Sequence, residues 1–250
     1  MFCRQNDYPI TKEDVIPKWI ARSLAGHKKP SFTNRTGRFI DDEWPEQEFG
    51  AVGKFGWEIA GPCSTRCNNG WMSRLELAAQ PIMTPLMRGE ACHVDATQIL
   101  TLAQWAFKTT MMYEYLRYKS GRYFSRRDRY DFYQSRRIQP QHTWIFAARY
   151  VGESAHHSIG GPTTVSFPDT SAEARGYCAT TAVGQLALQV LSYRPPEKFK
   201  GSLRVRVPAR WDGVHKPVWP VPPGWAWPPR FALDDDGFLK FATRLADTLS

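Results

Sequence analysis

The sequence has no long apolar run and no signal-like start. No uninterrupted apolar stretch approaches the ~18 residues that a bilayer-spanning helix requires. The opening residues 1–7, MFCRQND, also lack the apolar core of a secretory signal. We therefore expect a cytoplasmic protein with no membrane partner.

Cysteine is scarce, and no internal repeat is evident. Five cysteines in 250 residues are an odd number, which does not suggest a disulfide scaffold and favours a reducing compartment. In contrast, apolar residues make up 42% of the chain and aromatic residues 14%. This composition allows a large core and excludes wholesale disorder.

Positive charge is abundant and concentrated in one segment. The net charge is +9, and residues 117–137 hold eight basic side chains against Asp128 and Asp131, a net +6 in 21 residues. Aromatic residues are interleaved with these cations, a pattern typical of nucleic-acid contact. The alternative is a solvated connection whose aromatics pack on the body and whose arginines pair with acidic clusters.

The clearest predicted element is a helix over residues 96–118. Asp95 is a good N-cap, and Gln98 stands where the partner in a capping box belongs. Apolar residues occupy two faces of this helix, which predicts a central, buried position. An earlier helix is expected to follow the turn at residues 68–70 and to end before Pro81, with one apolar face at Trp71, Leu75 and Ala78.

The second half of the chain has the pattern of strands. Alternating β-formers predict them at residues 143–151, 176–183, 185–193 and 202–207. Residues 152–171 are expected to form a polar connection, and the Pro/Trp-rich residues 217–229 an extended or polyproline-like strap. A closing helix should start at Gly237, with an apolar face of Phe238, Phe241, Leu245 and Leu249.

Three motifs together resemble a known family. They are residues 11–19 (TKEDVIPKW), 63–76 (CSTRCNNGWMSRLE) and 105–109 (WAFKT). In order and interval they are similar to bacterial and phage proteins with an HNH-endonuclease-like, treble-clef (ββα-metal) N-terminus. The typical motifs of that family are E-H-V-I-P-x-W and C-x-x-C-N-N-G-W-M-S. The resemblance covers residues 3–116.

This resemblance implies metal-dependent cleavage of DNA at a site that is degenerate here. In the family a hairpin His deprotonates a water, and a divalent ion such as Mg²⁺ or Mn²⁺ stabilises the developing charge. The corresponding catalytic residues are Asp14, in the place of that His, together with Glu13 and Asn68. Aspartate is a poorer proton acceptor than histidine at neutral pH, although it can ligate a metal. Independently of the resemblance, Asn68 suits a turn into a helix.

The resemblance also implies a structural zinc knuckle, and its ligands are incomplete. The candidate metal ligands are Cys3, Cys63 and Cys67, but position 6 is Asn6 and Ser64 occupies a usual ligand position. A four-Cys zinc site therefore cannot form. One alternative is a site completed by His27 or Asp7; the other is a metal-free knuckle packed by Trp19, Trp57 and Trp71.

The predicted nucleic-acid interface combines the basic segment with one lysine of the central helix. Its members are Arg117, Lys119, Arg122, Arg126, Arg127, Arg129, Arg136, Arg137 and Lys108. The resemblance implies that Lys108 contacts a phosphate. Alternatively, Lys108 extends to the surface or pairs with a carboxylate such as Glu76.

These observations predict an α+β fold in three parts. An HNH-like ββα module (1–80) should dock on a helical segment (81–140) and a mainly antiparallel β region (141–250). The expected function is that of an HNH-nuclease-like protein that acts on or binds DNA. Two alternatives stay open: a catalytically inactive relative that binds DNA or a protein in a phage or host-defence setting, and a structural protein whose basic segment docks an acidic partner.

Overall fold

The computed structural model describes residues 2–3, 8–24, 32–36, 58–117, 122–139, 141–153, 156–166, 173–194 and 211–243. It contains helices together with mainly antiparallel sheets, which confirms the α+β class. Within these residues no helix combines the length and the apolar character needed to cross a membrane.

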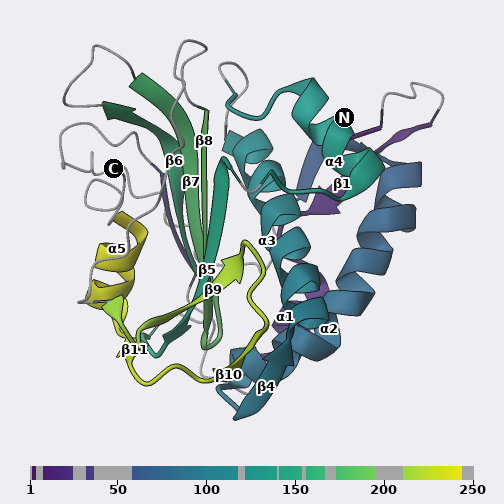
Figure 1. The fold of residues 1–250 in the computed structure, drawn as a ribbon. Helices are drawn as coiled ribbons and strands as arrows, with labels where there is room; N and C mark the ends of the chain where they lie inside the picture. Colours follow the sequence, from purple (N-terminus) through teal and green to yellow (C-terminus); the bar gives the residue numbers. More distant parts are fainter. Residues whose placement is uncertain are drawn as a thin grey trace.

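A seven-stranded sheet forms the centre of the molecule (Figure 1). The strand order is β11-β5-β8-β7-β6-β2, and β9 pairs with β5 beside this path. β2 is parallel to β6 and β11 is parallel to β5, whereas the other pairs are antiparallel. The strands are β2 (Phe32–Thr36), β5 (Thr143–Tyr150), β6 (His156–Ser166), β7 (Glu173–Val183), β8 (Leu186–Arg194), β9 (His215–Trp219) and β11 (Ala232–Leu233).

Three predicted strands are confirmed as β5, β7 and β8, but the polar connection predicted at 152–171 is wrong. Most of it is β6, an eleven-residue strand paired with β7 along its whole length. Polar side chains are tolerated there because they find partners across the sheet, as when the hydroxyl of Ser158 donates to Thr181 at 3.2 Å. The predicted strand at 202–207 lies outside the described residues.

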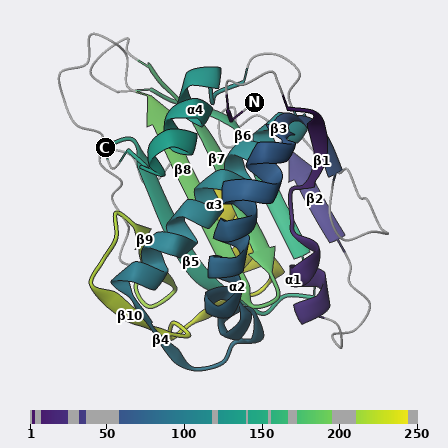
Figure 2. The same ribbon diagram turned by 90° about the vertical axis from the view of Figure 1, so that its right-hand side faces the viewer.

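Helices cover both faces of this sheet. On one face, α3 (Ala96–Arg117) lies between the sheet and α2 (Ser73–Arg88), and α4 (Arg126–Ser135) crosses nearby (Figures 1 and 2). On the other face, α5 (Asp235–Thr243) buries Phe238 and Phe241, so the predicted closing helix is present; Leu245 and Leu249 lie outside the described residues.

The central helix is α3, and it is confirmed with its predicted cap. The backbone N–H of Gln98 donates to Asp95 at 2.9 Å, and the N–H of Asp95 donates to the Gln98 side chain at 3.0 Å. Both faces are buried, as Leu102 and Trp105 show with at most 1% of their surface exposed.

The predicted end of the preceding helix before Pro81 is wrong. Helix α2 runs through Pro81 and Pro85 to Arg88. Each proline removes one backbone donor, and the packing of the helix against α3 offsets that cost. Its buried stripe passes through Ala79 rather than the exposed Ala78, and includes Leu75, Met83 and Leu86.

The N-terminal region contributes a two-stranded antiparallel sheet followed by helix, which together form the hairpin–helix unit. β1 (Ile10–Asp14) pairs antiparallel with β3 (Glu58–Ser64), although α1 (Lys18–Ser23) and β2 lie between them in sequence. A helical turn, η1 (Cys67–Met72), follows β3 and leads into α2; the predicted turn at 68–70 persists as a kink at Gly70. One apolar core extends from Phe2 through α2 and α3 to the sheet.

The Pro/Trp-rich segment is more regular than predicted. It contains β9 and β10 (Gly224–Trp227), which pair with β5 and with β4 (Cys92–Asp95), respectively. The chain is extended there, as predicted, but the pairing of these strands with β5 and β4 was not predicted. The prolines lie at strand ends and edge positions, where they remove no needed donor, and the indole N–H of Trp225 donates to the Pro217 carbonyl at 2.8 Å.

Candidate functional site

The predicted metal-binding amide, Asn68, is held inside the hairpin–helix unit. Asn68 lies on η1 directly after β3, and its side-chain amide donates to the Thr11 hydroxyl at 3.3 Å. Thr11 belongs to β1, so this hydrogen bond fastens the start of the helical run to the first strand of the hairpin.

The predicted base, Asp14, lies at the other end of the same strand. It follows Thr11 by three residues, which places it ~10 Å further along β1. Its carboxylate forms an ion pair with Lys18 at 3.5 Å. The fold therefore does not bring Asp14 and Asn68 together, and the two do not fit a shared Mg²⁺ or Mn²⁺ site. The backbone of Glu13 belongs to β1, but its side chain lies outside the described part of the structure.

Two of the three candidate zinc ligands converge, and they do so around a serine. The Cys3 thiol lies 3.0 Å from the Ser64 hydroxyl, and the backbone N–H of Cys67 points to the same hydroxyl at 3.4 Å. Burial raises the pKa of the Cys67 thiol, and a hydrogen bond with Cys3 raises that pKa further. The two thiols are therefore held by each other and by the hydroxyl of Ser64.

The third candidate ligand, Cys63, points elsewhere. Its thiol donates to the sulfur atoms of Met72 at 3.5 Å and Met112 at 3.7 Å, inside the apolar core. The prediction that Cys63 shares a site with Cys3 and Cys67 is wrong, because consecutive strand residues project to opposite sides and it is Ser64 that faces Cys3. The alternatives His27 and Asp7 lie outside the described residues. Within the described ranges, no three His, Cys, Asp or Glu side chains are grouped so that they could hold a metal ion.

Lys108 is a buried structural cation. It has no exposed surface, and its ammonium pairs with Glu76 at 2.5 Å. The same carboxylate accepts the indole N–H of Trp19 at 2.9 Å and of Trp105 at 2.8 Å. This cluster joins α1, α2 and α3. The prediction of Lys108 as a phosphate contact is therefore wrong, and the Glu76 alternative describes its environment.

Arg129 is also buried, against Glu114 of the central helix. The guanidinium is 3% exposed and lies 3.7 Å from a Glu114 oxygen. The Glu114 carboxylate accepts backbone N–H groups of Tyr123 and Phe124 as well. Burial raises the pKa of Glu114 to about 7, although these donors and Arg129 lower it. Arg129 has no surface left for a phosphate, so its predicted role in the interface is wrong.

Arg136 is half-buried at the end of α4. Its guanidinium lies 4.0 Å from the centre of the Trp71 ring and donates to the Phe132 carbonyl at 2.9 Å. Trp71 also packs edge-on against Phe132, at 5.9 Å between ring centres. Residues of α4 and η1 thus hold each other in place, as the packing alternative for the basic segment predicts.

The remaining basic residues of the segment form a partly exposed group. Arg126, Arg127 and Arg137 are exposed, and Arg122 is half-buried. Arg127 pairs with Asp131 at 3.6 Å, whereas no ion pair of Arg126 or Arg137 occurs in the described structure. Lys119 and the side chain of Arg117 lie outside it. Exposed Arg74 of α2 lies close enough to Arg136 to lower the pKa of that guanidinium, although burial is the larger cause.

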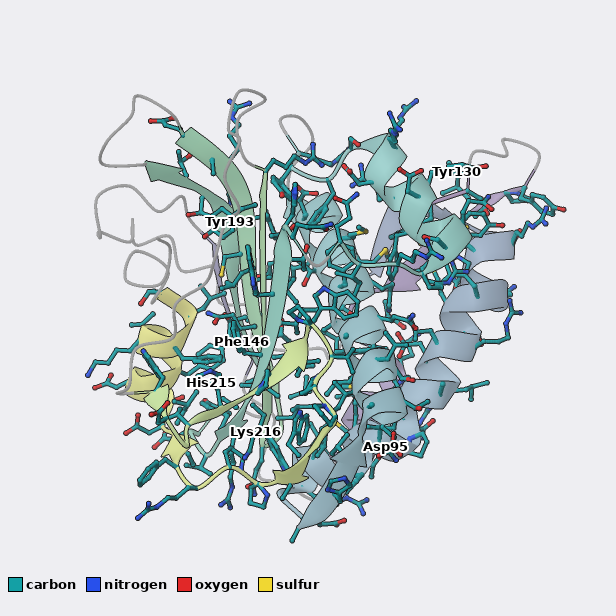
Figure 3. All side chains as sticks on the ribbon, in the orientation of Figure 1. Asp95, Tyr130, Phe146, Tyr193, His215 and Lys216 are labelled. Carbon is teal, nitrogen blue, oxygen red and sulfur yellow. The ribbon has the colours of Figure 1, made fainter. Side chains whose placement is uncertain are left out.

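A pocket beside α4 was not predicted. It has a volume of about 70 Å³ and lies between α4 and the ends of β5 and β8. Figure 3 labels Tyr193 on the sheet and Tyr130 on α4, and the pocket lies between these two elements. Its polar side chains include Tyr123, Thr143 and Ser192. No local motif could have indicated this pocket, because its walls come from segments up to 87 positions apart, between Phe107 and Arg194.

Comparison with known proteins gives no match to any family model, curated protein or solved structure.

Proposed function

We propose that this protein binds DNA through the exposed arginines of α4 and of the segment that follows it. We further propose that its hairpin–helix unit is an HNH-like framework without nuclease activity. The observation that carries the first proposal is the exposed group Arg126, Arg127 and Arg137, of which Arg126 and Arg137 form no ion pair within the described chain.

The spacing of these arginines supports contact with a phosphate backbone. Helix α4 is ten residues long, so about 15 Å separates Arg126 from the end of the helix that precedes Arg137. Successive nucleotides of one DNA strand rise ~3.4 Å each, so this distance spans four or five of them. Arg74, close to Arg136, extends the positive surface towards α2.

The rigidity of α4 supports the same proposal. The helix begins at a capping box, in which the N–H of Asp128 donates to Ser125 at 3.1 Å. It is also held against α3 by the ion pair between Arg129 and Glu114. A helix held in this way presents its arginines without a further loss of backbone entropy on binding.

The positions of the candidate catalytic residues support the proposal that the hairpin–helix unit has no nuclease activity. Asp14 is engaged by Lys18, and Asn68 is engaged by Thr11 at the opposite end of β1. A general base acts only within hydrogen-bond reach of the reacting water, and a metal must be held near the same phosphate.

The test is binding of a fluorescent DNA duplex, followed by anisotropy at several salt concentrations. For the wild-type protein we expect log affinity to fall steeply with log salt. The triple variant Arg126→Ala, Arg127→Ala, Arg137→Ala should bind at least roughly tenfold more weakly. Its salt slope should be smaller by about two to three, one for each phosphate that the variant no longer neutralises.

The matched control removes three exposed arginines from other surfaces. Arg88, Arg175 and Arg230 are exposed on α2, on β7 and before β11, so replacing all three with Ala makes the same change in net charge. Equal weakening in both triple variants would show that total charge, and not this surface, attracts DNA. If wild-type protein binds no DNA at low salt, an acidic protein partner becomes the better explanation of the basic surface.

A further inference from the structure

Two thiols of the hairpin–helix unit lie in direct contact. The Cys67 sulfur forms hydrogen bonds with the Cys3 thiol and with the Cys3 backbone. The Ser64 hydroxyl lies 3.0 Å from the Cys3 sulfur and accepts the backbone N–H of Cys67 at 3.4 Å. Ser64 therefore holds both cysteines from one side, and their sulfur atoms face each other.

A second pair of side chains keeps the same two segments together. Phe2, which precedes Cys3, packs edge-on against Trp71 at 5.4 Å between ring centres. Trp71 follows Cys67 by four residues on η1. All four side chains are buried. The two segments thus touch at two neighbouring points, which keeps the Cys3 and Cys67 sulfurs opposite each other.

The other three cysteines point elsewhere, and all five lie within the described residues. Cys63 is directed to two methionine sulfurs in the core. Cys178 of β7 is directed to a backbone carbonyl of α5 at 3.8 Å, on the opposite face of the sheet. Cys92 lies on β4, beyond the far end of α2, a helix about 24 Å long that begins next to η1. Cys3 and Cys67 are therefore the pair that can be joined without a change of fold.

We infer that Cys3 and Cys67 form a reversible disulfide when the protein meets a peroxide, and that this bond fastens the residues around Cys3 to η1. The inference goes beyond the proposed DNA binding and does not depend on it. A disulfide requires sulfur atoms about 2.05 Å apart. Thiols that already hydrogen-bond to each other reach that separation by a short movement of their side chains. In reducing compartments, disulfides of this kind are typically transient and redox-sensing.

The reaction balances with hydrogen peroxide as the oxidant. Cys3 belongs to no helix or strand, so exposing its thiol breaks no helical or sheet hydrogen bond. Its sulfur attacks one peroxide oxygen, the O–O bond breaks, and a sulfenic acid and one water result. The Cys67 sulfur then attacks the Cys3 sulfur, the S–O bond breaks, and a second water leaves. The two thiols together lose two electrons and two protons, which reduce the peroxide to water.

The test is peptide mapping of the full-length protein after treatment with hydrogen peroxide in the presence of a metal chelator. Free thiols are then alkylated under denaturing conditions, and the protein is digested with trypsin. The peptides 1–4 and 67–74 each contain one cysteine, and Cys63 falls in a separate peptide, 55–66. We expect peptide 1–4 joined to peptide 67–74, and we expect dithiothreitol to separate them.

Two variants make the test specific. Cys67→Ser should yield no linked peptide. The matched control Cys63→Ala removes a neighbouring buried thiol and should yield as much of the linked peptide as wild type. Sulfinic acid at Cys3 without any linked peptide, or linked peptides that contain Cys63, would overturn the inference, because Cys67 would then not be the thiol within reach of Cys3.

Thermal unfolding tests the fastening. The bond closes a loop of roughly 65 residues, which restricts the unfolded chain, so oxidised wild-type protein should melt at least about 5 °C above the reduced protein. Cys67→Ser should melt at the same temperature before and after peroxide treatment. A linked wild-type protein that melts no higher than the reduced one would overturn the fastening role of the bond.

Discussion

Individual buried charges explain why fewer cations of the predicted nucleic-acid interface are available than the sequence indicates. Arg129 and Lys108 are each almost fully buried, and each has a carboxylate partner on another helix. Removing one member of such a pair leaves an unpaired charge in the core, which typically costs several kcal/mol. These two cations therefore stabilise the helical layer, while their exposed neighbours remain available for a ligand.

Glu114 provides a test of this arrangement through pH. Its pKa is about 7 in the folded protein against an ordinary value of 4.5, so between these values the folded state holds a proton that the unfolded chain releases. Stability should therefore fall as pH rises from about 4.5 to about 7. At ~1.4 kcal/mol for each pH unit, the loss from this group is up to about 3 kcal/mol.

Urea unfolding from pH 4.5 to 8 measures this effect. Glu114→Gln should flatten the pH dependence over that range, whatever its absolute stability, because the amide does not titrate. Glu90 is exposed, and Glu90→Gln should leave the wild-type profile intact. A Glu114→Gln profile that parallels wild type would mean that the carboxyl titrates at its ordinary value.

Among the helices, α4 was not predicted as a separate element. Residues 117–137 were expected to contact nucleic acid or, alternatively, to form a solvated connection, and Arg126–Ser135 form a helix. The available signal was Ser125 followed three residues later by Asp128, the spacing of a capping box, which the structure forms. The apolar face of this helix is difficult to recognise from the sequence, because one of its buried residues is an arginine, Arg129, beside Phe132.

The junction of β3 and η1 allows a test of the HNH resemblance. Ser64, rather than Cys63, lies beside Cys3 and Cys67. Ser64→Cys would place three thiols around one point, a set that binds Zn²⁺ or Co²⁺ with an open fourth position. We expect this variant to bind Co²⁺ and to show the thiolate charge-transfer absorption that wild type lacks.

Thr65→Cys is the matched control, since it adds a thiol one position further along the chain. It should behave like wild type on titration with Co²⁺. Identical spectra of the Ser64 and Thr65 variants would argue that the junction is not a former zinc knuckle.

At the scale of the whole molecule, the question is whether the hairpin–helix unit can cleave DNA. Asp14 is paired with Lys18 at one end of β1, whereas Asn68 of η1 is bound to Thr11 near the other end of that strand. We therefore expect no metal-dependent nicking of supercoiled plasmid by wild-type protein with Mg²⁺ or Mn²⁺, beyond the level of the Asp14→Ala and Asn68→Ala variants. Nicking by wild type that both substitutions abolish would restore the nuclease hypothesis.

Much of the architecture followed from local chemistry. The Asp95 and Gln98 cap, the two-sided burial of α3, and strands β5, β7 and β8 were all predictable, because hydrophobic period and capping are properties of neighbouring residues. The continuation of helix α2 past Pro81 was not predicted, because the sequence rule that a proline ends a helix is local. That rule does not include the stability gained when Ala79 and Met83 are buried by tertiary packing against α3.

The α+β class, the central helix, the concentration of positive charge and the presence of Asp14 where the similar motif has a histidine all follow from local sequence pattern. Which charges are available depends instead on how the chain packs. Burial and pairing occupy Lys108 and Arg129, and leave Arg126 and Arg137 exposed. The pocket beside α4 also exists only in three dimensions, because the fold brings Phe107 of α3, Tyr123 and Ser192 of β8 to one place.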